Sequence, residues 1–355
     1  VWANDSEVSR KLPVSIVIPV YNRKEILAKT LAGIVHQTYP LELIEVVIAD
    51  DGSSDSPDEL VSKFEPFFKI KYVYQEDLGF RASAVRNLGI SVATHEHIIL
   101  LDCDMLPLPN LVDSFMQWMH VSDRVITIGK RRFVCTDDVS VDQILADVNC
   151  VIDLPDIDSE NKIVSSSQGV TVDWREQIYS SSNMLKDENF VFRVFCSGNV
   201  AFPKKLIEQI GGFDESFNHW GGEDTEFGYR CERAGYWFVP VDASLALHQE
   251  PPNGENETDR EEGKLITHEQ LIERCPRRYR KYQQDREYLI PKVSVFMPAY
   301  NCEDFIDEAI QSIVNQTYTD FELLITDDGG TDGTAEKVQC WVERDSRIHF
   351  FAKEN

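Results

Sequence analysis

Basic residues are scarce in this sequence of 355 residues: 35 Lys and Arg stand against 61 Asp and Glu, which gives a formal net charge of −26 at pH 7. A nucleic-acid-binding protein needs a basic surface to replace the counterions of the phosphate backbone. The shortage of basic residues therefore argues against nucleic acid as a partner. It does not exclude a small phosphate-bearing ligand, provided that local cations overcome the unfavourable overall field.

Zinc-binding and membrane-spanning patterns are also missing. The eight cysteines form no C-x-x-C pair, which argues against a zinc site and favours reduced thiols, as in the cytosol. No apolar run reaches the ~18 residues of a membrane span, and no signal peptide is found. We therefore expect a cytoplasmic protein. Peripheral association with the inner face of the membrane, or with an export complex, stays open because residues 277–281 are rich in basic side chains.

Short apolar runs alternate with helical patterns along the first part of the chain. Residues 14–20, 45–51, 70–76 and 97–102 have the β-branched, apolar character of strands. Patterns of helical period follow the first and the third of these runs. The alternation predicts an α/β fold with a mostly parallel sheet, in which ligands bind at the carboxyl ends of the strands.

Polar side chains gather where three of these runs end: Asn22 and Arg23, Asp50 and Asp51, and Asp102 and Asp104. Side chains at positions x and x+2 of an extended tip point the same way, so Asp102 and Asp104 could reach one divalent cation. Asp-x-Asp alone is a weak motif, and a solvated loop explains it as well. The neighbouring strand ends favour a binding site.

Further candidate residues follow outside these strand ends. Glu223 and Asp224 begin a predicted helix, whose dipole is expected to keep a carboxylate ionised as a base for an acceptor hydroxyl, although an ordinary helix start explains Glu223 equally well. His248 follows an apolar strand and would add a ligand to an Mn²⁺-type ion, but a lone His there is more often structural. Arg86 either faces solvent from a helix or binds a diphosphate.

The chain then repeats itself, since residues 293–332 match residues 14–55. No counterpart of Asp102-Cys103-Asp104 follows the second copy, so we expect this chain to be the N-terminal part of a longer polypeptide. The predicted organisation is a leader (1–12), a first domain (13–250), a helical linker (251–291) and a truncated second domain (292–355). The first domain is expected to comprise a nucleotide-binding half (13–135), an insertion (136–190) and an acceptor half (191–250).

Several stretches together resemble the family-2 glycosyltransferases with the GT-A fold: VSIVIPVYNR, VVIADDGSSD, GFRASAVRNLGI, LLDCDM, NVAF and FDESFNHWGGEDTEFGYR. HQEPPNGENETDREEGK and the repeat resemble more closely the bacterial chondroitin and hyaluronan synthases, which carry two transferase domains. The resemblance implies a Rossmann-like GT-A domain followed by the first half of a second copy. It also implies an inverting transferase with Mn²⁺ or Mg²⁺ as cofactor, a UDP-sugar donor and an oligosaccharide or polysaccharide acceptor.

The resemblance implies roles for individual residues. Asp224 would be the catalytic base, and Glu223 would contact acceptor or donor. Asp104, Asp102 and His248 would hold the metal. The nucleotide would contact Pro19, Tyr21, Asn22, Arg23, Asp50, Asp51, Arg86, Asp102 and Cys103. The sugars would contact Gly198, Asn199, Trp220, Gly221 and Gly222.

The donor sugar is expected to be an N-acetylhexosamine (GlcNAc or GalNAc), because the first domain of such synthases usually adds that sugar. Cys196 and Ser197 stand where small residues are expected beside the donor sugar, and Arg81 where an uncharged side chain is expected. Galactose, glucose and glucuronic acid therefore stay open. A nucleotidyltransferase would need a Gly-rich loop, which PVYNRKE lacks. A non-catalytic sugar-nucleotide-binding module would have no need of Asp104, Asp224 and His248.

Overall fold

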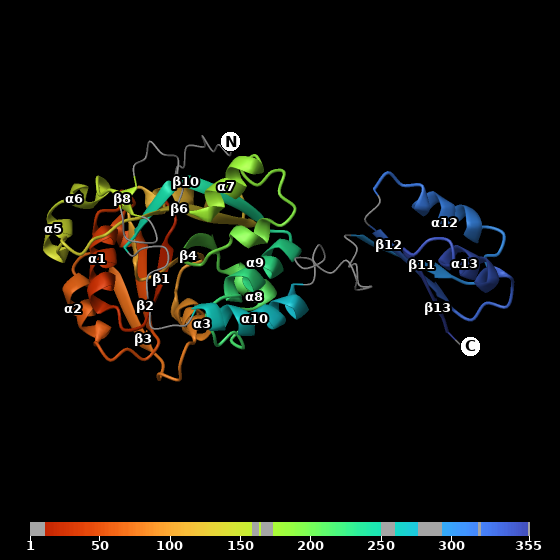
Figure 1. Ribbon diagram of the computed structural model, residues 1–355, viewed down its shortest axis with the longest axis horizontal. Coiled ribbons are helices and arrows are strands. Elements are labelled where there is room, and N and C mark those ends of the chain that lie inside the picture. The colour runs from red at the N-terminus through yellow and green to blue at the C-terminus, as the bar shows by residue number, and fades with distance from the viewer. Residues whose placement is uncertain are drawn as a thin grey trace. The chain divides into compact units, whose positions relative to one another are not determined.

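The computed structural model describes residues 11–157, 163–164, 173–249, 260–275, 293–318 and 321–353. The chain divides into two compact units, unit 1 up to Cys275 and unit 2 from Pro276 (Figure 1). The predicted leader lies outside the described residues except for its last two positions, and so do residues 251–259 and 276–291 of the predicted linker.

Unit 1 is built on an eight-stranded sheet with the strand order β3-β2-β1-β4-β9-β6-β10-β5. The four predicted strands form one half of it and run parallel: β1 (Val14–Val20), β2 (Ile44–Asp50), β3 (Lys69–Tyr74) and β4 (His97–Leu101). The other half contains β5 (Met105–Pro107), β6 (Val125–Phe133), β9 (Asn199–Pro203) and β10 (Trp237–His248). Since only β9 and β5 run antiparallel to their neighbours, the predicted α/β class with a mostly parallel sheet is confirmed.

Helices cover both faces of this sheet (Figure 1). The face that carries Ile16 and Ile18 packs against α1 (Lys24–Val35), α2 (Leu60–Phe64) and α4 (Leu111–Met119). The face that carries Val17 packs against α3 (Ala82–Val92). This double covering explains why β1 and β2 are apolar and buried along almost their whole length.

Helix α3 lies unusually close to the sheet. A Cβ atom on Gly89 would stand 2.4 Å from Cγ1 of Val17 and 3.1 Å from Cβ of Ala49, so only glycine fits between the helix and the strands. The close packing holds the N-terminal turns of α3, including Arg86, over the sheet's carboxyl edge.

The predicted insertion contains both helices and short strands. Its elements are α5 (Val141–Ala146), α6 (Asn149–Ile152), β7 (Asp156–Ile157), β8 (Ile163–Val164) and α7 (Trp174–Ser181). Short 3₁₀ turns elsewhere are η1 (Leu41–Leu43), η2 (Pro57–Glu59) and η4 (Val191–Val194).

Three further helices lie in the C-terminal part of unit 1: α8 (Lys205–Ile210), α9 (Glu223–Arg233) and α10 (Arg260–Arg274). Helix α10 falls within the predicted linker, yet it packs against α9, and unit 1 ends at Cys275. The boundary predicted at residue 250 is therefore too early, because α10 is part of the compact unit. None of the described helices is long and apolar enough to cross a membrane.

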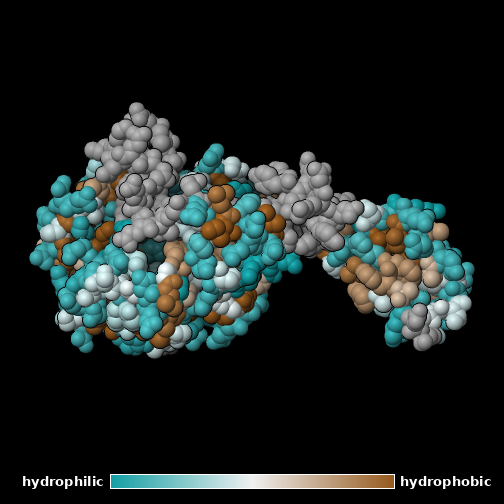
Figure 2. Space-filling view, turned by 60° about the horizontal axis from the view of Figure 1, so that its bottom comes forward, coloured by the Kyte–Doolittle hydropathy of each residue, from teal (hydrophilic) through white to brown (hydrophobic). Residues whose placement is uncertain are grey.

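Unit 2 is a three-stranded parallel sheet of β11 (Val293–Ala299), β12 (Phe321–Asp327) and β13 (Ile348–Ala352), with helices α12 (Ile306–Val314) and α13 (Thr334–Val342). Apolar residues gather on its surface in Figure 2. Phe296, which matches the fully buried Val17 in the repeat, is 65% exposed. That unit 2 is the first half of a second copy stays a prediction.

Candidate active site

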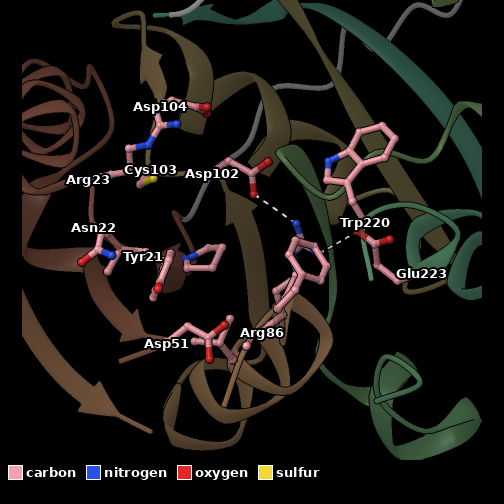
Figure 3. A pocket seen from close by; sticks show the side chains of 16 residues that line it. Tyr21, Asn22, Arg23, Asp51, Arg86, Asp102, Cys103, Asp104, Trp220 and Glu223 are labelled. Atoms are coloured by element: carbon pink, nitrogen blue, oxygen red, sulfur yellow. Dashed lines mark hydrogen bonds and ion pairs between the residues drawn. The ribbon is translucent and has the colours of Figure 1, made fainter. Parts of the chain in front are cut away.

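A cavity of about 570 Å³ opens at the carboxyl ends of β1, β2 and β4 in unit 1 (Figure 3). Most residues predicted to bind nucleotide, metal or acceptor line it: Pro19, Tyr21, Asn22, Arg23, Asp51, Arg86, Asp102, Cys103, Asp104, Trp220 and Glu223. They come from segments distant in the sequence, and the parallel strands bring their carboxyl ends to one edge. The location of the site thus agrees with the sequence analysis, whereas the role of each residue stays a prediction.

The loop after β1 is tied to the loop after β2. Asn22 has a left-handed backbone (φ 50°), and its side-chain oxygen accepts hydrogen bonds from the backbone N–H of Ser54 at 2.8 Å and from its hydroxyl at 3.0 Å. The backbone N–H of Asn22 in turn donates to the hydroxyl of Ser53 at 2.9 Å. Asn22 therefore shapes the cavity wall as well as lining it.

The adjacent aspartates at the end of β2 have different environments. Asp50 is fully buried and does not line the cavity; its carboxylate accepts hydrogen bonds from the Ser53 backbone N–H at 2.8 Å and from the Tyr72 hydroxyl. Asp51 lines the cavity and accepts from Gln75 Nε2 at 2.5 Å and from the Arg81 backbone N–H at 3.2 Å. Burial raises the pKa of Asp51. Only Asp51 is placed to contact a ligand.

Asp102 and Asp104 lie in a tight turn rather than on an extended tip, since the backbone N–H of Met105 donates to the carbonyl of Asp102 at 3.0 Å. The tip is therefore not extended, which was the basis for expecting both side chains to point the same way; both side chains are labelled in Figure 3. Asp102 Oδ1 lies 3.4 Å from Arg86 Nη2, and Asp104 Oδ2 lies 3.5 Å from His248 Nε2.

The predicted metal ligands are neighbours but are not assembled. Among the described residues, no three His, Cys, Asp or Glu side chains form a group that could hold a metal ion. The donor types nevertheless fit Mn²⁺ or Mg²⁺, because Asp104 Oδ1 is buried with no hydrogen-bond partner among the described residues. Such ions accept one or two carboxylates and complete their shell with water and phosphate oxygens, so a preformed three-residue cage is not required.

Arg86 is buried in the wall of the cavity, which rules out the solvent-facing interpretation. Its Nη1 lies 3.3 Å from Glu223 Oε1, and its Nη2 bridges to Asp102. The guanidinium carbon stands 5.6 Å from the centre of the Phe213 ring. The Arg86 guanidinium thus joins the end of β4 to the start of α9 across the cavity.

Glu223 and Asp224 begin α9 as predicted, after the left-handed Gly222 (φ 98°). Burial and the adjacent Asp224 carboxylate raise the pKa of Glu223 to about 7, which opposes the expected effect of the helix dipole on this residue. Asp224 Oδ2 accepts a hydrogen bond from the backbone N–H of Ser197 at 3.1 Å. Asp224 Oδ1 is buried with no hydrogen-bond partner in the described part of the chain.

Two residues that were predicted to contact the sugars, Asn199 and Gly198, instead make contacts within the protein. Asn199 lies in β9 and does not line the cavity; its Nδ2 donates at 3.0 Å to the carbonyls of Lys130 and Ser244. Gly198 lets Asp102 approach, since a Cβ there would stand 2.6 Å from Asp102 Oδ2. Gly221 (φ 93°) adopts a backbone conformation that other residues rarely accept.

Sequence reasoning missed Gln75, which binds the Asp51 carboxylate, and Phe80, which lines the cavity. Gln75 stands just after β3, so its position at a strand end was the signal that could have identified it. A helical linker was expected over residues 251–291, but sequence reasoning missed that its helix α10 contacts residues 214–222.

Comparisons with known proteins agree with the family resemblance. The family model "Glycosyl transferase family 2" matches residues 15–211 and again 294–355, and "N-terminal domain of galactosyltransferase" matches residues 180–249. The chain is 42% identical to a chondroitin synthase of Escherichia coli and 40% identical to a hyaluronan synthase of Pasteurella multocida, each over 96% of its length. It spans only 50% and 36% of these two relatives.

Solved structures share the fold at low identity. A mannosyltransferase, PcManGT, from Pyrobaculum calidifontis in complex with GDP-Man and Mn²⁺ is 17% identical, with a TM-score of 0.53 over 77% of this chain and 65% of that one. GalNAc-T7 with UDP, GalNAc and Mn²⁺ is 16% identical, with a TM-score of 0.50 over 75% of this chain and 48% of that one. These likenesses confirm the predicted GT-A fold.

Proposed function

The chain belongs to glycosyltransferase family 2, and from this membership we propose that unit 1 moves a sugar from a UDP-sugar to a glycan acceptor with inversion at the anomeric carbon. One observation carries the proposal. A single cavity joins Asp51, Arg86 and Asp102 at the strand ends to Glu223 at the start of α9, with Asp224 next along that helix. This grouping offers polar contacts for a nucleoside diphosphate on one side and a carboxylate base on the other.

The donor would bind along the strand ends. Asp51 would accept hydrogen bonds from the uracil or ribose, and Arg86 would face the diphosphate. Asp104, Asp102 and His248 would hold Mn²⁺ or Mg²⁺. The bound cation would act as a Lewis acid that stabilises the charge developing on the leaving nucleoside diphosphate. In a chain with a net charge of −26, such compensation favours binding of an anionic donor.

Asp224 would be the catalytic base. The hydrogen bond from Ser197 to its Oδ2 fixes the orientation of the carboxylate and leaves Oδ1 for the acceptor hydroxyl. The acceptor oxygen forms a bond to the anomeric carbon as the bond from that carbon to the UDP oxygen breaks. UDP leaves with the electron pair, and the hydroxyl proton passes to Asp224. An α-linked donor gives a β-linked product.

Glu223 would serve the site differently from its neighbour. With a pKa raised to about 7, it is partly protonated at neutral pH, and its Oε1 contacts Arg86. It would therefore position the guanidinium and contact donor or acceptor, while Asp224 takes the proton. Two adjacent carboxylates with different environments commonly divide such roles.

The transferred sugar would be GlcNAc or GalNAc. Support comes from the relatives named chondroitin synthase and hyaluronan synthase, which this chain matches over 96% of its own length. Cys196 and Ser197, which follow η4 and precede β9, lie beside the Asp224 carboxylate and keep another hexose as the second candidate.

The test is product analysis with purified chain, Mn²⁺ or Mg²⁺, and UDP-GlcNAc, UDP-GalNAc, UDP-glucuronic acid, UDP-galactose and UDP-glucose in turn. Chondroitin and hyaluronan oligosaccharides of defined length serve as acceptors, and mass spectrometry detects extension. We expect extension by one N-acetylhexosamine in a β-linkage, with EDTA abolishing UDP release. Binding of UDP-sugars without turnover on any acceptor would identify a non-catalytic module instead.

A further inference from the structure

Helix α10 has one buried face, although its sequence lies beyond the strand that ends the predicted first domain. Gly263, Thr267, Leu271 and Cys275 follow one another at helical spacing and are all buried. Leu265, on the opposite side of the helix, is 76% exposed. A helix with a single apolar face packs that face against something, and in unit 1 it lies against α9 and the loop before it (Figure 1).

The C-terminal half of α10 holds the first part of that loop. Arg274 forms an ion pair with Asp214, and its guanidinium carbon lies 5.8 Å from the centre of the Phe217 ring. Gln270 Nε2 donates to the carbonyl of Ser216 at 3.3 Å. These contacts anchor the loop by charge, by an aromatic ring and by its backbone.

The N-terminal half of α10 holds the end of the loop, at Trp220. A Cβ on Gly263 would stand 2.8 Å from the carbonyl oxygen of Trp220 and 2.9 Å from its backbone nitrogen, so the helix and the loop backbone are in direct contact. Lys264 Nζ lies 5.4 Å from the centre of the Trp220 indole. Thr267 contacts the loop at Gly222: a Cβ atom on Gly222 would stand 3.2 Å from the Cβ atom of Thr267.

The loop held by α10 leads directly to residues of the cavity wall. Trp220 lines the cavity, and Gly222 is followed at once by Glu223 and Asp224, the first residues of α9. Figure 3 shows the Trp220 indole and Glu223 on the same side of the cavity. Residues of α10 that never reach the reacting atoms thus set the backbone from which the acceptor side of the site is built.

We propose that α10 is the positioning element for acceptor binding, acting through Gly263, Lys264 and Thr267 on the loop that carries Trp220. The expected change in acceptor KM rests on the proposed function. The effect of α10 on the loop backbone does not depend on that function. Gly263, Lys264 and Thr267 are positioning residues, because they act through Trp220 and the start of α9 rather than on a substrate.

The variant Gly263→Ala tests the close contact with Trp220. Alanine is a better helix former than glycine, so α10 itself is not weakened, while the new methyl group displaces the backbone of Trp220. We expect the KM for a chondroitin or hyaluronan oligosaccharide to rise about tenfold, with the KM for the UDP-sugar within twofold of the unmodified chain. Leu265→Ala, on the exposed side of the same helix, is the matched control and changes neither constant.

Lys264→Gln provides a second variant that leaves the helix backbone intact. Because a cation over a half-buried indole contributes little compared with a backbone contact, we expect the acceptor KM to rise about two- to fivefold. This variant keeps the inference testable if Gly263→Ala does not fold. An acceptor KM unchanged in both variants would overturn the inference.

Hydrogen exchange of peptides covering residues 213–222 separates this inference from the proposed function, because it needs no turnover. We expect faster exchange there in Gly263→Ala than in the unmodified chain and in Leu265→Ala, with exchange in β1 and β2 unchanged. If no donor is transferred but this difference is found, the proposed function fails and the positioning role of α10 stands. Unchanged exchange in Gly263→Ala, or an equal rise in both KM values, would refute the positioning role.

Discussion

At the scale of single residues, Arg86 ties the site together. Its buried guanidinium is shared between Asp102, from the turn after β4, and Glu223, from the start of α9. An unpaired carboxylate in such an environment is costly, whereas the shared cation pairs with the buried Glu223 and with the partly exposed Asp102. The arrangement therefore couples Asp102, which is predicted to contact the nucleotide, to Glu223 at the start of α9 through one side chain.

Asp224→Asn should abolish sugar transfer while UDP binding persists, because the amide cannot accept the proton of the acceptor hydroxyl but keeps the shape of the carboxylate. We expect kcat to fall by a factor of about 10²–10⁴. The measurement is UDP release from the UDP-sugar that the product analysis identifies as the donor. Asp123→Asn, which alters an exposed ion pair with Lys205, is the control and retains activity. Full activity in Asp224→Asn would refute the assigned base.

Glu223 predicts a pH dependence of stability. Its pKa in the folded chain is raised from 4.5 to about 7, so the folded state binds a proton that the unfolded state releases. The resulting stabilisation is complete below about pH 4.5 and is lost as the pH rises through about 7. The difference in unfolding free energy between Glu223→Gln and the unmodified chain should therefore shift in favour of the variant by about 3 kcal/mol from pH 4.5 to pH 8.

Urea unfolding of both proteins across that range measures this shift. Leu265→Ala, at an exposed position of α10 that does not titrate, is the control and should show no such change with pH. A difference between Glu223→Gln and the unmodified chain that is constant with pH would show that Glu223 titrates normally.

At the scale of secondary-structure elements, the position of α3 depends on a single missing side chain. Gly89 brings the helix against Val17 and Ala49, and Arg86 stands one turn before that contact. Helix propensity alone would favour alanine at this position. Glycine is there because the space between helix and sheet excludes a methyl group.

Gly89→Ala should therefore destabilise the chain by about 1–3 kcal/mol, as overpacking of a core does, despite the gain in helix propensity. Val17→Ala makes room for the new methyl group, so the two changes together should cost less than the sum of the single changes. Urea unfolding of the single and double variants gives this coupling. Ser91→Ala, exposed on the same helix, is the control; additive costs would argue against direct contact.

At the scale of the whole molecule, the two units differ in how their sheets are covered. The sheet of unit 1 has helices on both faces, whereas the described residues of unit 2 include no equivalent of α3 or β4. In unit 1, β1 is flanked by β2 and β4, whereas β11 pairs with β12 alone among the described strands. The cavity and its lining belong entirely to unit 1. We therefore propose that unit 1 with α10 is the smallest functional part.

A fragment of residues 1–275 should bind UDP-sugars with the affinity of the whole chain. A fragment of residues 1–250 lacks α10, exposes the loop at Phe217 and should be less stable by at least about 2 kcal/mol, since it loses the burial of Leu271 and Cys275. Thermal unfolding and titration with UDP measure both quantities. Equal stability of the two fragments would restore the boundary that the sequence predicted.

The sequence alone was enough for the fold class and the family, and it predicts where the site lies. Continuous apolar runs identify strands covered on both faces, and polar residues at their ends must meet at one edge of a parallel sheet. Asn22, Asp51 and Asp102 were singled out by this reasoning, whereas Pro19 and Tyr21 came from the family resemblance. Local pattern suffices for such predictions because strand direction and order follow from the alternation of elements.

Only the tertiary structure decided which of these side chains face the cavity. Asp50 and Asp51 are equivalent in the sequence, yet neighbouring residues of an extended chain point to opposite sides, and only one of them reaches the ligand space. The burial of Arg86 and the separate partners of Asp102 and Asp104 depend on residues more than a hundred positions away or on a turn that spacing does not specify. Helix α10 joins the site for the same reason: its partners are contacts in space, and contacts of that kind leave no period in the sequence.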